Sequence, residues 1–342
     1  MMAARMTRLP RLVCASFLLW CAYLVSSAPV TARTPDLSRI AAIDGPADLV
    51  QVDGTVLYVV ADRTLRIVDI TNPSVPKAAG AFTFPEHIRS FAVSGSSVYV
   101  LADFHGIRIL DVSNPASPVL RGSLPLKGGY FTIVLFDKNV LLASGILAGL
   151  QIIDVSDVAK PAPLASYFTD GYAQSISVSR PLAYVIDAPT GLYVFDLSNP
   201  RSPAVVTVLK LNAPQQQSPG AITTGSVAIS EAVAGRSPET AVLLDSTNSL
   251  LLFYDVSRLA APVRISSFSV PAGSEALVVR GSMAYIASGR QGLQIVDFSN
   301  PIKPVDSGTF KTMQPAHDVA VADSVVFVAT GSGGVIIFRS SQ

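Results

Sequence analysis

Cysteine and tryptophan are nearly absent from this chain of 342 residues, which contains two Cys and one Trp. All three, Cys14, Trp20 and Cys21, lie close to the N-terminus. If that segment is removed, no thiol remains, so disulfides and thiol catalysis are excluded and burial and backbone pairing must stabilise the fold. Charge is also sparse, at 14% of residues with a net charge of +1. This balance gives no indication of nucleic acid or an anionic membrane surface as a partner.

The segment 1–32 is typical of a secretory signal peptide. Three arginines precede an apolar run from Leu12 to Val25, and small residues follow up to a cleavage site after Ala32. A membrane span needs about 20 apolar residues, so a retained anchor is the weaker alternative and we expect no stable span after cleavage. We therefore predict export to the periplasm or the extracellular space.

The sequence also has no long stretch in which apolar residues recur every three to four positions, as they do in a helix. Short runs of β-branched and aromatic residues, typical of strands, recur instead. The phrase LRIVDITNP at Leu65 returns six times, and its aspartate position recurs at intervals of 42, 43, 42, 59, 42 and 42 residues. Four short strands in a period of this length are typical of a propeller blade. We predict an all-β, seven-bladed β-propeller of four-stranded antiparallel blades as a single domain, 33–342. The repeated positions are Asp69, Asp111, Asp154, Asp196, Asp255 and Asp297, with Arg339 in the last repeat.

The two ends of the repeat array are incomplete in complementary ways. The last repeat stops directly after its third strand, whereas residues 33–44 precede the first blade and have no inner strands of their own. We expect the segment 33–44 to supply the outer strand of the last blade, because this pairing closes the ring and removes an exposed sheet edge.

The Asp-x-Ser/Thr-Asn-Pro phrase is interpreted as the turn out of the third strand. Asp and Ser side chains can accept or share hydrogen bonds with nearby backbone groups, and Pro bars continuation of the strand. A metal-binding role is disfavoured, because one aspartate per blade is too dispersed to share an ion.

LRIVD, LQIIDVS and LQIVDFSNP resemble the LVIVD repeat, found in a family of exported bacterial repeat proteins. The resemblance covers essentially the whole chain after the leader. It departs in the fifth repeat, where Arg258 and Leu259 replace Asn-Pro, and at Arg339. The resemblance implies a propeller and export, and it says little about chemistry.

Candidate functional residues lie in connections that should share one face of the propeller, which is a fold-level analogy. Three histidines, His87, His105 and His317, fall in these connections. No nucleophile–base pair and no metal-ligand spacing can be identified, so no catalytic residue or metal ligand is assigned, and any cofactor stays open. Alignment on the innermost strand predicts a ring of ligand-binding candidates around one mouth of the channel, with Asp318 beside it: Asp48, Arg89, Phe131, Gln174, Glu275 and His317.

Two functions follow from these candidates. The first is a non-enzymatic, exported scaffold that binds a protein or a glycan. The alternative is a small-ligand or metal-binding protein, or an enzyme, that uses the channel mouth around His317 and Asp48. Convergence of these side chains in one pocket would favour the alternative, and dispersed side chains favour the scaffold. The long interval adds an insertion within 212–240 whose role stays open between a binding loop and a neutral insertion, and the oligomeric state is open as well.

Overall fold

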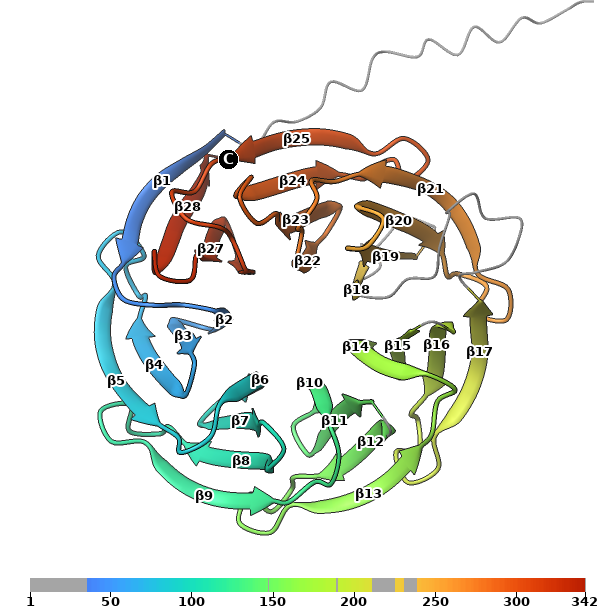
Figure 1. The fold of residues 1–342 in the computed structure, drawn as a ribbon, viewed down its shortest axis with the longest axis horizontal. Coiled ribbons are helices and arrows are strands. Elements are labelled where there is room, and N and C mark those ends of the chain that lie inside the picture. Colours follow the sequence, from blue (N-terminus) through green and yellow to red (C-terminus); the bar gives the residue numbers. More distant parts are fainter. Residues whose placement is uncertain (1–35, 147, 189, 211–224, 231–238, 342) are drawn as a thin grey trace, which may run out of the picture. The chain divides into compact units, whose positions relative to one another are not determined.

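The computed structural model describes residues 36–146, 148–188, 190–210, 225–230 and 239–341. The predicted signal peptide and most of the insertion lie outside these residues. The described residues form seven four-stranded antiparallel sheets, arranged as blades around a central axis (Figure 1). The prediction of a seven-bladed propeller is confirmed. No helix in this part of the chain is long and apolar enough to cross a membrane.

Each blade runs from an innermost strand outward, and blades 1 to 7 are numbered by these strands. The innermost strands are β2 (Leu49–Asp53), β6 (Ile88–Ser94), β10 (Tyr130–Asp137), β14 (Tyr172–Ser179), β18 (Gly225–Ser230), β22 (Ala276–Arg280) and β26 (Asp318–Ala322). The second strands are β3 (Val56–Ala61), β7 (Ser97–Ala102), β11 (Val140–Gly145), β15 (Leu182–Ala188), β19 (Thr240–Asp245), β23 (Met283–Ala287) and β27 (Val325–Ala329).

The outer half of each blade contains the repeated phrase. The third strands are β4 (Thr64–Asp69), β8 (Gly106–Asp111), β12 (Gly149–Asp154), β16 (Gly191–Asp196), β20 (Leu250–Asp255), β24 (Leu293–Asp297) and β28 (Val335–Ser341). The outermost strands are β5 (Lys77–Thr83), β9 (Val119–Leu124), β13 (Ala162–Tyr167), β17 (Ala204–Lys210), β21 (Val263–Ser269), β25 (Val305–Phe310) and β1 (Asp36–Ile43). In six blades the third strand ends at the repeated aspartate.

That aspartate forms the turn predicted for it. Asp69 Oδ1 accepts hydrogen bonds from the Thr71 backbone N–H at 2.8 Å and from the Thr71 hydroxyl at 2.7 Å. In the same turn, Asn72 Oδ1 accepts from the Ser74 N–H. The same Asp-to-i+2 bond recurs in the other five turns. The repeated carboxylates are therefore engaged in turns, as the sequence indicated.

The apolar faces of the strands pack between neighbouring blades rather than within one. Seven clusters of buried side chains result, such as the one that joins Leu142 and Ile152 of blade 3 to Val185 and Phe195 of blade 4. Burial of these faces is the main favourable term that holds the ring together. The rigid ring in turn positions the connecting loops.

The ring is closed by pairing of the two ends of the described chain. β1 is the outermost strand of blade 7 and pairs antiparallel with β28, with Leu37 opposite Ser340 and Ile43 opposite Val335. Figure 1 shows β1 beside β28. This pairing is consistent with the predicted closure by the N-terminal segment.

Candidate functional site

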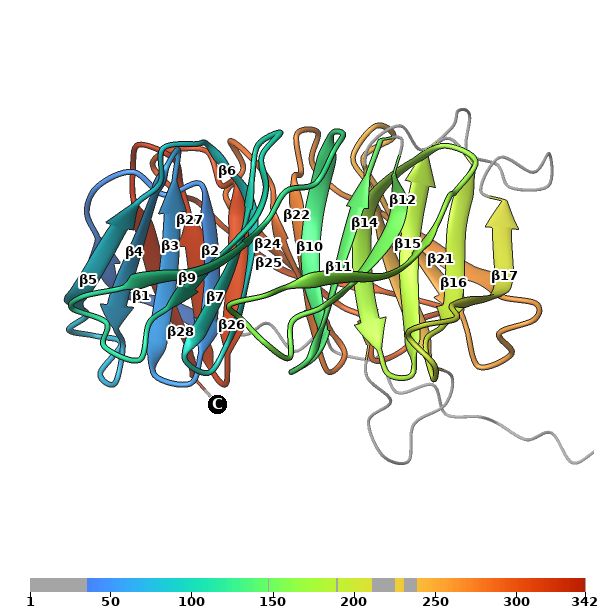
Figure 2. The same ribbon diagram turned by 90° about the horizontal axis from the view of Figure 1, so that it is seen from below.

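The loops gather at two faces, because the strands run roughly along the axis (Figure 2). We call one of them the entry face. It is formed by the connections that precede each innermost strand, such as 84–87, and by the loops between second and third strands, such as 103–105. The opposite side is the exit face. All nine residues predicted as ligand-binding candidates lie at the entry face.

Three residues of the predicted ring occupy β-bulges. The pairing of β6 with β7 skips Arg89, that of β10 with β11 skips Phe131, and that of β14 with β15 skips Gln174. A bulged residue is released from the ladder and its side chain is re-aimed, often next to functional sites. Arg89 and Phe131 are the second residues of their strands and Gln174 is the third, whereas the sequence alignment placed all three just before the strands.

His317 and Glu275 come together across two neighbouring blades. The Nδ1 atom of His317 lies 2.9 Å from Glu275 Oε2, and both side chains are partly exposed. The Nε2 side of the ring lies against Gly331, where a Cβ would be only 3.2 Å away. The glycine therefore leaves space for the imidazole.

Asp318, the next residue, turns away from this pair to the seam between blades 7 and 1. Its Oδ2 accepts from the Val50 N–H at 2.9 Å and its Oδ1 from the Val319 N–H at 2.8 Å. Although the residue as a whole is partly exposed, its carboxyl group is buried. This burial raises the pKa of Asp318 to about 7, against the opposing effect of the two hydrogen bonds. Asp318 thus links two blades, and the ligand contact predicted for it stays a prediction.

The remaining candidates form two further groups. Asp48 Oδ2 accepts from the Asp62 N–H at 3.2 Å, and His87 Nε2 lies 3.8 Å from Asp62 Oδ1. In blade 2, Arg89 Nε donates to Asp103 Oδ1 at 3.0 Å.

His105 also belongs to this second group, because its Nδ1 lies 2.5 Å from the Asp103 carbonyl oxygen. Phe131 and Gln174 are partly buried. The structure therefore joins two of the candidates, His317 and Glu275, whereas Asp48, His87, Arg89 and His105 contact the loop aspartates Asp62 and Asp103. His317 contacts Glu275, and Asp48 contacts Asp62 of its own blade.

An arc of exposed apolar side chains on the entry face was missed by the sequence reasoning. We define this apolar arc as Phe104, Ile146, Phe168 and Tyr172. Phe104 and Phe168 are each 72% exposed, and the four residues come from adjacent blades or connections across blades 2, 3 and 4. The Phe168 backbone also packs against Gly149 of the loop that contains Ile146. Phe104 lies beside His105 in a connection that the sequence identified, but the sequence does not show which apolar residues of such connections stay exposed, and the fold does.

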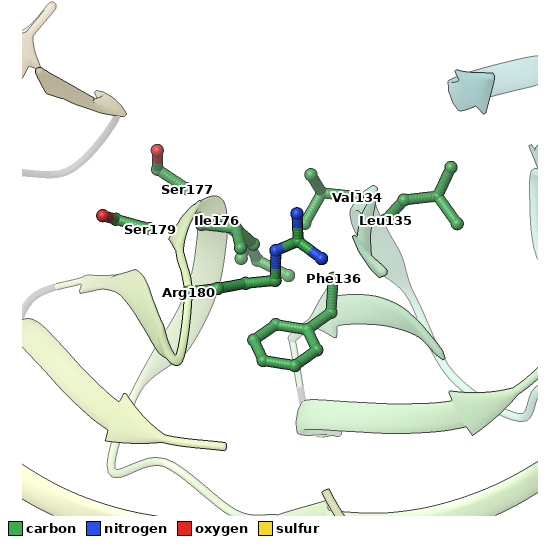
Figure 3. A pocket seen from close by; sticks show the side chains of 8 residues that line it. Val134, Leu135, Phe136, Ile176, Ser177, Ser179 and Arg180 are labelled. Atoms are coloured by element: carbon green, nitrogen blue, oxygen red, sulfur yellow. The ribbon is translucent and has the colours of Figure 1, made fainter. Parts of the chain in front are cut away.

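A pocket at the exit face was also missed. Its volume is about 620 Å³, and it lies at the far ends of β10 and β14, with buried Phe136 beside Ser177 and Ser179. Figure 3 shows Arg180 extending across it toward Phe136. An adjoining pocket of about 630 Å³ shares Phe136 and Arg180 and adds Lys138.

Comparison with known proteins identifies repeat families and the fold. The family model described as "Beta propeller domain" matches residues 41–188, and the model described as "LVIVD repeat" matches residues 170–209 and 273–312. Together these matches span more than half of the chain. No curated protein sequence matches it.

Two solved structures show the same architecture at low sequence identity. The β-propeller domain of Cps50 (Swd1) from Myceliophteria thermophila is 13% identical, with a TM-score of 0.69 over 89% of this chain and 100% of that one. The computationally designed Ika8 protein is 9% identical, with a TM-score of 0.62 over 88% of this chain and 98% of that one. At these identities the similarity concerns the fold alone.

Proposed function

This chain belongs to the LVIVD-repeat β-propellers, and from that premise we propose that it is an exported scaffold that binds a protein partner on its entry face. The observation that carries the proposal is the apolar arc. Exposed apolar residues scattered singly are normal on a protein surface, whereas exposed aromatic residues on adjacent blades of one face mark an interaction surface.

The composition of this face fits a protein partner. Protein interfaces have aromatic and aliphatic residues at their centre and a polar, solvent-accessible rim. Phe104 and Phe168 provide the apolar anchors, and Arg89 with Asp103 provides a charged pair on the same blade as Phe104. Exposed ion pairs of this kind contribute about 0–1 kcal/mol to stability, so they remain available for recognition.

A glycan is the second candidate for this face, since aromatic rings also offer flat surfaces for sugars. The aliphatic Ile146 in the arc favours a protein. The small-ligand alternative at the channel mouth is less supported, because His317 and Asp48 engage different partners, Glu275 and Asp62. Dispersed pairs favour a broad contact surface over one enclosed pocket.

Capture from the periplasmic and culture fractions tests the proposal. The wild-type chain should retain a specific protein, and the double variant Phe104→Ala, Phe168→Ala should lose at least nine-tenths of it. Two anchors of this kind each contribute about 2 kcal/mol or more to a protein interface. The bound protein should then be purified and its affinity for both forms measured by calorimetry.

The matched control replaces exposed apolar residues of the exit face. Val75 and Ile302 lie in turns at that side and are well exposed, and the variant Val75→Ala, Ile302→Ala should bind as the wild type does. Equal loss in both double variants would refute the entry face as the binding surface. Saturable binding on a glycan array that depends on Phe104 and Phe168 would replace the protein partner with a glycan. Cell fractionation of the tagged full chain tests export.

A further inference from the structure

One position of the third strand interacts with the connection that enters the same blade. Arg66 is the third residue of β4 and pairs with Val59 of β3. Its guanidinium donates to the carbonyl oxygens of Asp44 and Gly45 at 2.6 and 3.2 Å, and to that of Pro46 at 2.7 Å. In blade 1, the positive charge of Arg66 is therefore surrounded by carbonyl oxygen atoms of the connection that precedes β2.

Blade 2 repeats this arrangement with a carboxylate. Arg108 is the third residue of β8 and pairs with Val100. Its Nη2 donates to Glu86 Oε1 at 2.6 Å, and both side chains are largely buried. Glu86 follows Asp44 by 42 residues, one repeat along the chain. The connection again supplies the oxygen atoms and the third strand supplies the cation.

In blade 4 the connection again provides oxygen atoms, but the third residue of the third strand is not an arginine. The third residue of β16 is Tyr193, which pairs with Val185 in the same register. Arg108 and Tyr193 are 85 residues apart, so Asp170 lies one residue before the position equivalent to Glu86. Its Oδ2 accepts from the Tyr193 hydroxyl at 2.9 Å. Burial, the hydrogen bond to Asp170 and the charges of Asp170 and Asp187 raise the pKa of Tyr193 to about 12. Two carboxylates, Asp170 and Asp187, therefore disfavour ionisation of this one hydroxyl.

The second carboxylate, Asp187, is buried without a counter-charge. It is 1% exposed, and its Oδ2 accepts from the Gly171 N–H at 3.2 Å. Within the part of the chain that the structure describes, its Oδ1 has no hydrogen-bond partner, and neither does the buried hydroxyl of Thr169. Among the described residues, no Lys or Arg forms an ion pair with Asp170 or Asp187.

Further oxygen atoms face the same place. Beside Gly171, a Cβ would lie 2.4 Å from the Ala188 carbonyl oxygen and 2.5 Å from Asp187 Oδ1. A glycine is therefore required here, because any side chain would collide with these two oxygen atoms. A buried carboxylate is costly unless a positive charge or a full set of hydrogen bonds compensates it.

We propose that blade 4 binds a calcium ion in the place that an arginine guanidinium occupies in blades 1 and 2. The ligands are oxygen atoms of Asp170, Asp187, Tyr193 and Thr169, with carbonyl groups of the connection. Hard cations prefer such all-oxygen sets, and Ca²⁺ accepts irregular geometry that Mg²⁺ does not. Only two carboxylates take part, so the set differs from a cluster of three or more His, Cys, Asp or Glu side chains, which the described residues do not contain.

Calorimetric titration of the chelator-washed full chain with CaCl₂ tests the site. The wild type should bind one ion with a dissociation constant of about 1 mM or lower, and Ca²⁺ should raise its thermal midpoint. Asp187→Asn and Asp170→Asn should each weaken binding at least tenfold. The matched control is Asp103→Asn, which removes a carboxylate of the same face in blade 2 and should leave Ca²⁺ binding unchanged.

A second variant restores the cation of the other blades. Tyr193→Arg should place a guanidinium among the two carboxylates, so that the thermal midpoint no longer responds to Ca²⁺. The absence of saturable heat in the wild type would overturn the proposal, as would full Ca²⁺ binding by Tyr193→Arg or equal loss in Asp103→Asn. Saturation by MgCl₂ at the same concentration would also overturn the choice of ion. The site is independent of the proposed protein partner, because its titration requires none.

Discussion

Single residues join neighbouring blades at three seams through the turn of the repeat. The Pro115 carbonyl oxygen in the turn of blade 2 lies against Gly80 of β5, where a Cβ would be only 1.7 Å away. The Val158 carbonyl oxygen of blade 3 lies against Gly122 of β9 in the same way, at 1.9 Å. In blade 5 the corresponding contact is a hydrogen bond from the Ser266 hydroxyl. The turn is therefore an inter-blade contact as well as a chain reversal.

Replacing Gly122 tests this contact. In Gly122→Ala the added methyl group would collide with backbone, which cannot move aside as a side chain can. We expect a loss of about 1–3 kcal/mol in the free energy of unfolding, as for other overpacked sites, measured by urea denaturation. Gly129→Ala is the control, because the nearest atom to its Cβ is the end of the flexible Ile146 side chain, at 3.0 Å. Equal stability of both variants would contradict the proposed contact.

At the scale of elements, the sequence predicts the strand order and the closure by the N-terminal segment. It predicts the candidate functional sites only in part. The period predicts four strands per blade, and alignment of the repeats predicts which residues surround the channel mouth. The cluster in blade 4 could not be found in this way. Asp187 lies in AYVID, which has the pattern of an ordinary strand, and it meets the connection that contains Asp170 only because the end of β15 folds against that connection. The apolar arc likewise depends on which loops the ring brings side by side.

β1 is the element whose removal tests closure of the ring. A chain that begins after Ile43 would leave β28 as an exposed edge and would uncover the core that Leu37 covers. We expect its thermal midpoint to fall by about 10 °C or more, since 1 kcal/mol corresponds to about 2–4 °C in a large domain. A chain that begins at Asp36 is the control and should melt as the full chain does without its leader. A peptide of residues 36–43 should restore part of the loss.

At the scale of the whole molecule, side chains of one innermost strand hold backbone groups of the next. Ser90 Oγ accepts from the Ile133 N–H at 3.2 Å, and Ser175 Oγ accepts from the Val227 N–H at 3.3 Å. At the seam between the last and first blades, this role falls to Asp318. The side-chain contact between the innermost strands at this seam is therefore made by a group that can ionise, whereas the two serines cannot.

The stability of the ring should consequently depend on pH through Asp318. Its pKa of about 7 in the folded chain exceeds the value of about 3.9 expected on unfolding, so the folded state binds an extra proton between about pH 4 and 7. The free energy of unfolding should fall as the pH rises through this window. The loss should be on the order of 4 kcal/mol over the whole window, because the two pKa values differ by about 3 and each tenfold difference in proton affinity corresponds to about 1.4 kcal/mol.

Urea denaturation of the wild type and Asp318→Asn at pH 5 and pH 8 measures this difference. The Asn variant keeps a carbonyl acceptor and cannot ionise, so it should lack the decrease between the two values, and identical decreases would refute the role of Asp318. Below pH 4 both proteins should lose stability together. The turn hydrogen bonds lower the pKa values of Asp69, Asp111, Asp154 and Asp196, so their contribution is present above the unfolded pKa and disappears as the pH falls through the folded one. The turns and the seam therefore respond to acid in opposite directions and in separate pH ranges.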